Sequence, residues 1–322
     1  MTELYNRGVG VKKELKGFLF VILAASLWGL AGTVAKYLFN KAIDPLVLVE
    51  IRLSLSALIL GLLLAVFKPK LLRISSQDIP YLVTLGIFGV AGVQLAYFIT
   101  VSQTNVATAV FLQYISPIIV SLYAVFFLKE KMSLLQLLCL LLAVGGSYLM
   151  VFSQGIKISP LGLVSGLASA VTVSVYTIYS RRGLQMYNSW TLLFYCFLAG
   201  AIALAFIVPP WRIPGENFTT TNLLFFIYIA VFATIIPFGS YFLGLRHLKP
   251  TTAGITATLE PVVAAFTAFL FLKERLALPQ VLGALMVLGS VILIQLKTQA
   301  KLSEATLPVS VVELCREEPK PS

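Results

Sequence analysis

A single carboxylate inside a long apolar run is the most informative chemical feature of the sequence. Glu260 lies in LEPVVAAFTAFLFLKER (259–275), within an apolar run that extends from Thr251 to Leu272. Such a run reaches the length of about 20 residues that crosses a bilayer. At ~1.5 Å of rise per residue, Glu260 would lie roughly 14 Å along the helix axis, near the membrane midplane. A charge at that depth costs at least about 2.5 kcal/mol, so we expect Glu260 to be protonated, paired or turned toward a wet cavity.

Two roles for Glu260 stay open at this point. It could load and release a proton as a cavity alternates between the two sides of the membrane, which makes protons a candidate coupling ion. Alternatively, it could be a structural group that stays protonated, or that is hydrogen-bonded to a neighbouring helix, and never titrates.

A second charged group is predicted toward the outer ends of the first two apolar runs. Glu50 and Arg52 would lie about 8 and 10 Å into the second run at ~1.5 Å per residue, and residues two positions apart point to different faces. A Lys36–Glu50 ion pair would leave Arg52 free to bind a substrate carboxylate, which its planar guanidinium suits. In the alternative arrangement, Lys36 extends outward and Glu50 pairs with Arg52. Glu50 is also a candidate for proton coupling.

Polar side chains recur at helical spacing in several apolar runs, a pattern that marks the side turned away from lipid. A single hydroxyl could merely support helix packing, whereas stripes that converge with Tyr, Gln and a carboxylate favour a cavity. Pro117 and Pro261 each remove a backbone hydrogen bond, so we expect kinks that free the carbonyls of Gln113 and Ala257. The predicted substrate-binding residues are Arg52, Gln94, Tyr97, Gln113, Tyr114, Tyr176, Tyr241 and Thr256.

The composition is that of a polytopic membrane protein. Of the 322 residues, 59% are hydrophobic and 11% charged, whereas a soluble domain has roughly 25% charged residues; the mean hydropathy is +0.94. The net charge of +11 comes from cationic clusters between apolar runs. In a membrane chain these clusters act as orientation signals, so no nucleic-acid partner is expected. The three cysteines show no CxxC and no metal-ligand spacing, so neither a metal nor another cofactor is expected.

Ten apolar runs bounded by charge, Pro, Gly or Asn are expected to be transmembrane helices in contact with membrane lipids. Most Lys and Arg residues then fall on one side, which predicts that both termini are cytoplasmic; Lys273 and Arg275 are the exception. Residues 1–15 are predicted to be a cytoplasmic segment and 297–322 a cytoplasmic tail that is disordered from Leu302. The ten runs lie at about 17–39, 45–67, 79–101, 105–128, 133–152, 160–180, 189–209, 222–244, 250–272 and 279–296.

An internal repeat organises these runs. QYISPIIVSLYAVFFLKEK (113–131) aligns with ATLEPVVAAFTAFLFLKER (257–275) at a shift of 144 residues, and the same shift pairs Gln136 with Gln280. Each half then holds five helices, and because five is odd the second half enters the membrane in the opposite orientation. We therefore expect an all-α integral membrane fold: ten transmembrane helices in two inverted five-helix repeats (16–152 and 160–296) around a central cavity.

These motifs resemble the drug/metabolite transporter superfamily, its EamA-domain family in particular. The resemblance rests on a proline followed by FLKE in the fourth and ninth runs, on ASLWG in the first and on YTIYSRR in the sixth, and it covers about residues 16–296. It implies export or import of small metabolites across a bacterial plasma (inner) membrane and leaves the substrate open.

The sequence thus predicts a secondary transporter, or permease, that moves a small organic metabolite by alternating access. It lacks GxxxxGK[ST], and it has one histidine and no HExxH, so neither ATP hydrolysis nor another enzyme activity is expected. A cavity rich in Tyr, Ser, Thr and Gln, with few cations besides Arg52, suits an amino acid or related zwitterion as the substrate. Efflux of hydrophobic drugs or other toxic compounds is the alternative. The glycines of AVGGSY (143–148) predict a contact between the fifth and tenth helices or, alternatively, a homodimer contact.

Overall fold

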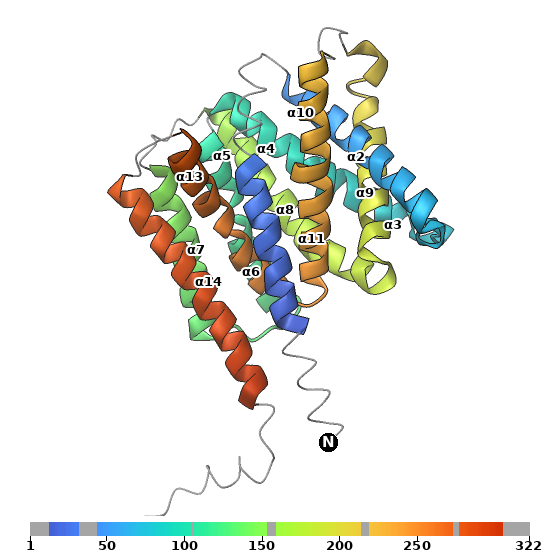
Figure 1. The fold of residues 1–322 in the computed structure, drawn as a ribbon. Coiled ribbons are helices and arrows are strands. Elements are labelled where there is room, and N and C mark those ends of the chain that lie inside the picture. The colour runs from blue at the N-terminus through green and yellow to red at the C-terminus, as the bar shows by residue number, and fades with distance from the viewer. Residues whose placement is uncertain are drawn as a thin grey trace, which may run out of the picture.

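The computed structural model describes residues 13–31, 44–104, 106–152, 159–213, 219–272 and 277–304, and within these ranges it is a helical bundle with no strand (Figure 1). Eight of the described helical segments are long and apolar enough to cross a membrane. They are Lys13–Ala31; α2 (Pro45–Phe67); the segment of α3 (Ile79–Thr84), η3 (Leu85–Ala91) and α4 (Gly92–Gln103); α5 (Val106–Gln113) with α6 (Ser116–Phe126); α7 (Leu134–Phe152); α8 (Pro160–Met186); α10 (Thr220–Ala230) with η6 (Val231–Ile235) and α11 (Ile236–Leu245); and α14 (Leu278–Glu304).

The two other predicted runs are also helical, but one is short and the other is interrupted. α9 (Ser189–Ala205) has 17 residues, the lower end of the range of about 17–25 residues that spans a bilayer. The run 250–272 is divided into α12 (Pro250–Ala257) and α13 (Leu259–Leu272). Ten helical runs are therefore described, of which eight have the length and hydropathy of a membrane span.

The C-terminal end of the helical region differs from the prediction. α14 continues to Glu304, so residues 297–304 are helical where the sequence predicted a tail. The segment KTQAKLSE is rich in good helix formers and contains neither Gly nor Pro, which explains the extension. Residues 305–322, the rest of the predicted disordered tail, lie outside the described residues.

α7 and α14 pack along each other at one side of the molecule (Figure 1). Gly146 and Gly283 allow this close approach. A Cβ on Gly146 would lie 2.6 Å from the Gly283 carbonyl oxygen, and a Cβ on Gly283 would lie 2.4 Å from the Gly146 carbonyl oxygen. The contact predicted between the fifth and tenth helical runs is thus confirmed, whereas a homodimer stays a prediction.

Local features recur in the two halves at the spacing of the sequence repeat. The Gln136 side chain accepts a hydrogen bond from the Ser133 amide (3.0 Å), and Gln280 accepts one from the Ala277 amide (2.8 Å). Wide π-helical turns form η3 and η6, and these overlap after a shift of 144 residues. The same shift relates the interruption between α5 and α6 to the interruption between α12 and α13.

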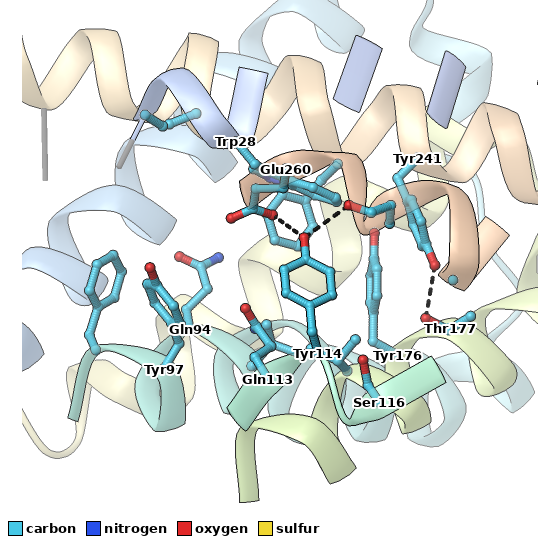
Figure 2. A pocket seen from close by; sticks show the side chains of 18 of the residues that line it. Trp28, Gln94, Tyr97, Gln113, Tyr114, Ser116, Tyr176, Thr177, Tyr241 and Glu260 are labelled. Carbon is cyan, nitrogen blue, oxygen red and sulfur yellow. Dashed lines mark hydrogen bonds between the residues drawn. The ribbon is translucent and has the colours of Figure 1, made fainter. Parts of the chain in front are cut away.

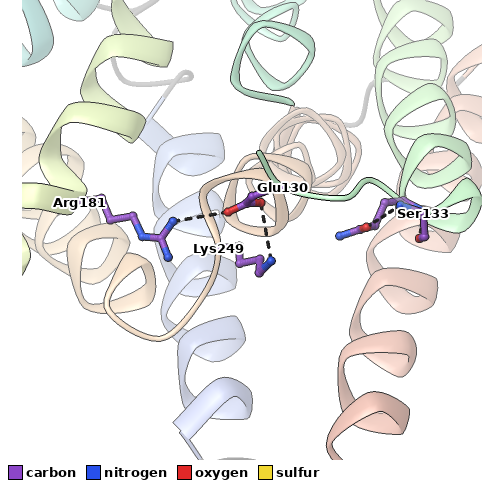
Figure 3. A network of polar contacts seen from close by, with 5 residues as sticks. Glu130, Ser133, Arg181 and Lys249 are labelled. Carbon is purple, nitrogen blue, oxygen red and sulfur yellow. Dashed lines mark hydrogen bonds and ion pairs between the residues drawn. The ribbon is translucent and has the colours of Figure 1, made fainter. Parts of the chain in front are cut away.

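The first FLKE motif ends in a small ion-pair network (Figure 3). Glu130 lies 3.6 Å from the Arg181 guanidinium of α8 and 3.8 Å from the Lys249 amino group, which directly precedes α12. The acid of this motif thus pairs with two cations from the second half of the chain. Lys273 and Glu274 of the second motif lie outside the described residues.

Candidate binding site

A cavity of about 130 Å³ lies between the two halves of the chain. Its walls come from the helix Lys13–Ala31, α2, α4, α5 and α6 of the first half, and from α8, α10, η6, α11, α12 and α13 of the second. α7 and α14 contribute no residue to the described wall, so that pair supports the bundle from outside the site. Figure 2 shows polar and aromatic side chains from both halves converging on this space.

The structure brings most of the predicted site residues together. Every predicted substrate-binding residue except Thr256 lines the cavity. These residues are Arg52, Gln94, Tyr97, Gln113, Tyr114, Tyr176 and Tyr241. Glu260, the predicted proton-coupling residue, and Pro117, a predicted kink, line the cavity as well.

Thr256, Glu50 and Pro261 do not line the cavity. Thr256 is fully buried and its hydroxyl donates a hydrogen bond to the Thr252 carbonyl (2.8 Å). The helix is interrupted between Thr256 and Glu260, so the two residues do not share a face as they would in one continuous helix. Glu50 accepts a hydrogen bond from the Ser54 hydroxyl (2.8 Å).

Glu260 is linked to the first half of the chain through Tyr114. The Tyr114 hydroxyl oxygen lies 2.8 Å from Glu260 Oε2 and 2.9 Å from the Ala257 carbonyl oxygen (Figure 2). Pro261 has no N–H to donate to the carbonyl four residues before it, which is that of Ala257. The acceptor predicted from Pro261 is thus contacted by a side chain from the junction between α5 and α6.

Arg52 is held by the π-helical turn of η6. Its Nε donates to the Thr234 hydroxyl (2.6 Å) and its Nη2 donates to the Ala233 carbonyl (2.7 Å). The guanidinium carbon lies 5.7 Å from the ring centroid of Phe98 on α4. Among the residues that the structure describes, Glu50 and Arg52 do not pair with each other, and Lys36 is not among these residues.

Gln94 and Tyr176 present unpartnered polar groups to the cavity. Each side chain is only 3% exposed, and neither amide atom of Gln94 nor the Tyr176 hydroxyl has a hydrogen-bond partner within the protein. A buried polar group without a partner costs about 1–3 kcal/mol. These groups are therefore placed to bind a polar ligand or water.

Aromatic rings form much of the remaining wall. The Trp28 ring packs edge-on against Phe238 with centroids 5.2 Å apart, and the rings of Tyr176 and Tyr241 stack at 5.7 Å. Our sequence reasoning missed Trp28, Phe98, Thr177 and Phe238 as wall residues. Trp28 belongs to the ASLWG motif, which was the available signal. The described part of the chain contains no cluster of three or more His, Cys, Asp or Glu residues that could hold a metal ion.

Comparison with known proteins identifies the class. The EamA-like transporter family matches residues 15–152 and 160–296. The chain therefore belongs to the EamA-like transporter family, and it is a membrane transporter.

Individual relatives agree with this assignment. The chain is 29% identical over 294 residues to the uncharacterized inner membrane transporter YicL of Salmonella typhimurium, covering 89% of this chain and 97% of that protein. It is 27% identical to an uncharacterized transporter of Clostridium kluyveri, covering 86% of this chain and 92% of the relative. A solved crystal structure at 17% identity superposes with a TM-score of 0.73, covering 87% of this chain and 96% of its own, which shows a shared fold. The predicted family and the transporter class are confirmed.

Proposed function

We propose that this protein is a secondary transporter for a small organic zwitterion, such as an amino acid, and that it works by alternating access. The observation that carries the proposal is the presence of Arg52 and of the unpartnered Gln94 amide in one cavity formed by both halves. A guanidinium binds a carboxylate through two parallel hydrogen bonds. The carbonyl oxygen of Gln94 accepts hydrogen bonds, as an ammonium group requires.

The two groups lie on connected parts of the wall. Gln94 and Phe98 are one turn apart on α4, and the Arg52 guanidinium lies over the Phe98 ring. In the proposed complex the substrate carboxylate contacts Arg52, and its ammonium contacts Gln94 Oε1 and the faces of neighbouring aromatic rings, which attract cations.

Cavity size supports a small substrate. The cavity of about 130 Å³ is comparable to an engineered cavity of about 150 Å³ that binds benzene. The aromatic wall supports the alternative, efflux of hydrophobic drugs, but most drugs are much larger than benzene. Arg52 is the sole Lys or Arg among the described wall residues, whereas a phosphate ester calls for several cations.

The proposed architecture is ten transmembrane helices in two inverted repeats, 16–152 and 160–296. The recurring glutamine contacts, π-helical turns and helix interruptions support it. In this arrangement α9 and the α12–α13 pair are the remaining two spans, and a break near the midplane is typical of the discontinuous helices of secondary transporters.

We further propose a bacterial plasma (inner) membrane location with both termini in the cytoplasm. The first described helix begins and α14 ends at the same end of the bundle (Figure 1). Lys and Arg gather in the connecting segments assigned to that side, as the positive-inside rule requires. The relative named as an inner membrane transporter supports the location.

Binding tests the substrate class directly. A ligand that binds only the folded protein raises its stability by about 2.7 kcal/mol at 100 times the dissociation constant. Thermal unfolding of the purified full chain should therefore shift upward with one group of amino acids. Stabilisation by hydrophobic drugs alone, with none from amino acids, would support the alternative instead.

A further inference from the structure

The Tyr114 hydroxyl lies between two oxygen atoms that both accept hydrogen bonds. Glu260 Oε2 is 2.8 Å away and the Ala257 carbonyl oxygen is 2.9 Å away. Both distances lie within the ordinary range for O–H···O hydrogen bonds. A tyrosine hydroxyl carries one proton, so it makes one linear hydrogen bond at full strength or shares that proton in a weaker bond to both atoms.

Counting protons separates the two charge states of Glu260. If Glu260 is a carboxylate, it only accepts hydrogen bonds, so the two short contacts must share the single proton of Tyr114. If Glu260 is protonated, its hydroxyl donates to Tyr114 while Tyr114 donates to the Ala257 carbonyl. Each contact then has a proton of its own, which favours the protonated form.

The same contacts join the two helix interruptions. Tyr114 lies between α5 and α6, and Ala257 is the last residue of α12, just before the break that precedes α13. When Glu260 loses its proton, Tyr114 should donate to the carboxylate, because a charge-assisted hydrogen bond is roughly twice as strong as a neutral one. The Ala257 carbonyl then loses its bond to the other half of the chain.

We propose that the described conformation is the proton-loaded state of the transporter, and that Tyr114 is a positioning residue that couples the proton on Glu260 to the contact between the two helix interruptions. The inference rests on the proposed transport function and adds its regulation by protons. A proton that binds one conformation better than another shifts the population toward it.

Other titratable groups face Glu260 from the surrounding elements. Within the described wall they are Arg52 from α2, Tyr97 from α4, Tyr176 from α8 and Tyr241 from α11. The helix Lys13–Ala31 lies close to Glu260 at Gly29. A Cβ atom added at Gly29 would lie 2.7 Å from the Glu260 carbonyl oxygen. The hydroxyl of Tyr241 lies 3.1 Å from that of Thr177, and Arg52 is held by Thr234 and Ala233. The hydrogen bond to the Glu260 carboxyl group comes from Tyr114, in addition to these groups.

Infrared spectroscopy of the full chain in liposomes tests the protonation state without any substrate. A protonated carboxyl has a C=O stretching band that a carboxylate lacks. At mildly acidic pH the wild type should show a component of this band that is lost in Glu260→Gln and kept in Glu50→Gln, which alters a buried acid outside the cavity. A wild-type spectrum without a band assignable to Glu260 would overturn the inference.

The role of Tyr114 is tested in the same samples. Titration of Glu260 should change the backbone carbonyl region of the spectrum in the wild type and in Tyr176→Phe, whose lost hydroxyl has no partner. In Tyr114→Phe the carboxyl band should still titrate, but this backbone change should be absent. Equal spectra for Tyr114→Phe and Tyr176→Phe would contradict the role given to Tyr114.

Transport supplies the functional readout. Exchange of a radiolabelled amino acid in proteoliposomes should depend on pH in the wild type and in Tyr195→Phe, which removes a hydroxyl that lies outside the cavity and donates to the Leu72 carbonyl. The pH dependence is measured as the ratio of the exchange rate at acidic pH to the rate at alkaline pH. In Tyr114→Phe this ratio should be about fivefold closer to one than in the wild type, the factor that corresponds to one neutral hydrogen bond. A pH-independent wild type would overturn the inference. If no amino acid exchanges at all, the proposed substrate class fails and the infrared results alone decide the inference.

Discussion

Replacement of Arg52 by alanine should change substrate preference as well as affinity. A guanidinium carries five N–H donors, and the bonds to Thr234 and Ala233 use two of them. The three that remain include donors on both terminal nitrogens, so a substrate carboxylate can be bound through both of its oxygens. A hydrogen bond to a charged group contributes about 1.5–3 kcal/mol, so Arg52→Ala should weaken a carboxylated substrate by roughly 10- to 150-fold.

The assay is competition against counterflow of a labelled amino acid, with the unlabelled amino acid and its carboxamide as paired competitors. Arg52→Ala should weaken the acid far more than the amide, and Arg52→Lys should recover part of the difference, because lysine keeps the charge but not the planar fork. Glu50→Gln changes a buried carboxyl group on the same helix, outside the cavity, and should leave the ratio unchanged. Equal losses for the acid and the amide in a folded Arg52→Ala protein would refute the carboxylate role.

Three further predictions concern the cavity, the helix scaffold and pH. Gln94→Leu should weaken α-amino acids about 5-fold more than the corresponding α-hydroxy acids in the same competition assay, as expected for one hydrogen bond; equal losses would exclude contact with the ammonium. Gly146→Ala should lower thermal stability by about 1–3 kcal/mol through overpacking against α14, whereas Gly145→Ala, whose Cβ would meet only a flexible methionine at 3.5 Å, should not. Burial and nearby cations lower the pKa of His247 below 6.5, so the unfolded chain gains a proton first as pH falls. The free energy of unfolding should therefore decrease as the pH falls below about 6.5, and His247→Gln should make that decrease smaller.

The sequence predicted features that depend on local pattern. The second run was placed at 45–67 and α2 spans Pro45–Phe67, because its apolar stretch is bounded by Asp44 and Lys68. Pro117 and Pro261 marked both helix interruptions, since proline removes a backbone donor wherever the fold places it. Gln136 and Gln280 recur in the repeat and make the same contact at the starts of α7 and α14.

Other features depend on contacts between distant segments and carry no local signal. Arg52 is positioned by Thr234, 182 residues further along the chain, and no spacing rule connects the two. Thr256 was assigned to the cavity on the assumption of one continuous helix, and the break before α13 removes the basis for that face. Phe98 and Phe238 line the cavity, yet in sequence they look like any other apolar residue of a membrane helix.

The central claim, that this cavity carries a zwitterion across the membrane, is tested most directly by counterflow. Proteoliposomes that contain the full chain are loaded with one unlabelled amino acid, and uptake of the same labelled compound from outside is followed over time. We predict rapid uptake that exceeds that of unloaded vesicles for one class of amino acids, and its loss in Arg52→Ala. Folded wild-type protein that exchanges no zwitterion, or that exchanges only hydrophobic drugs, would contradict the account.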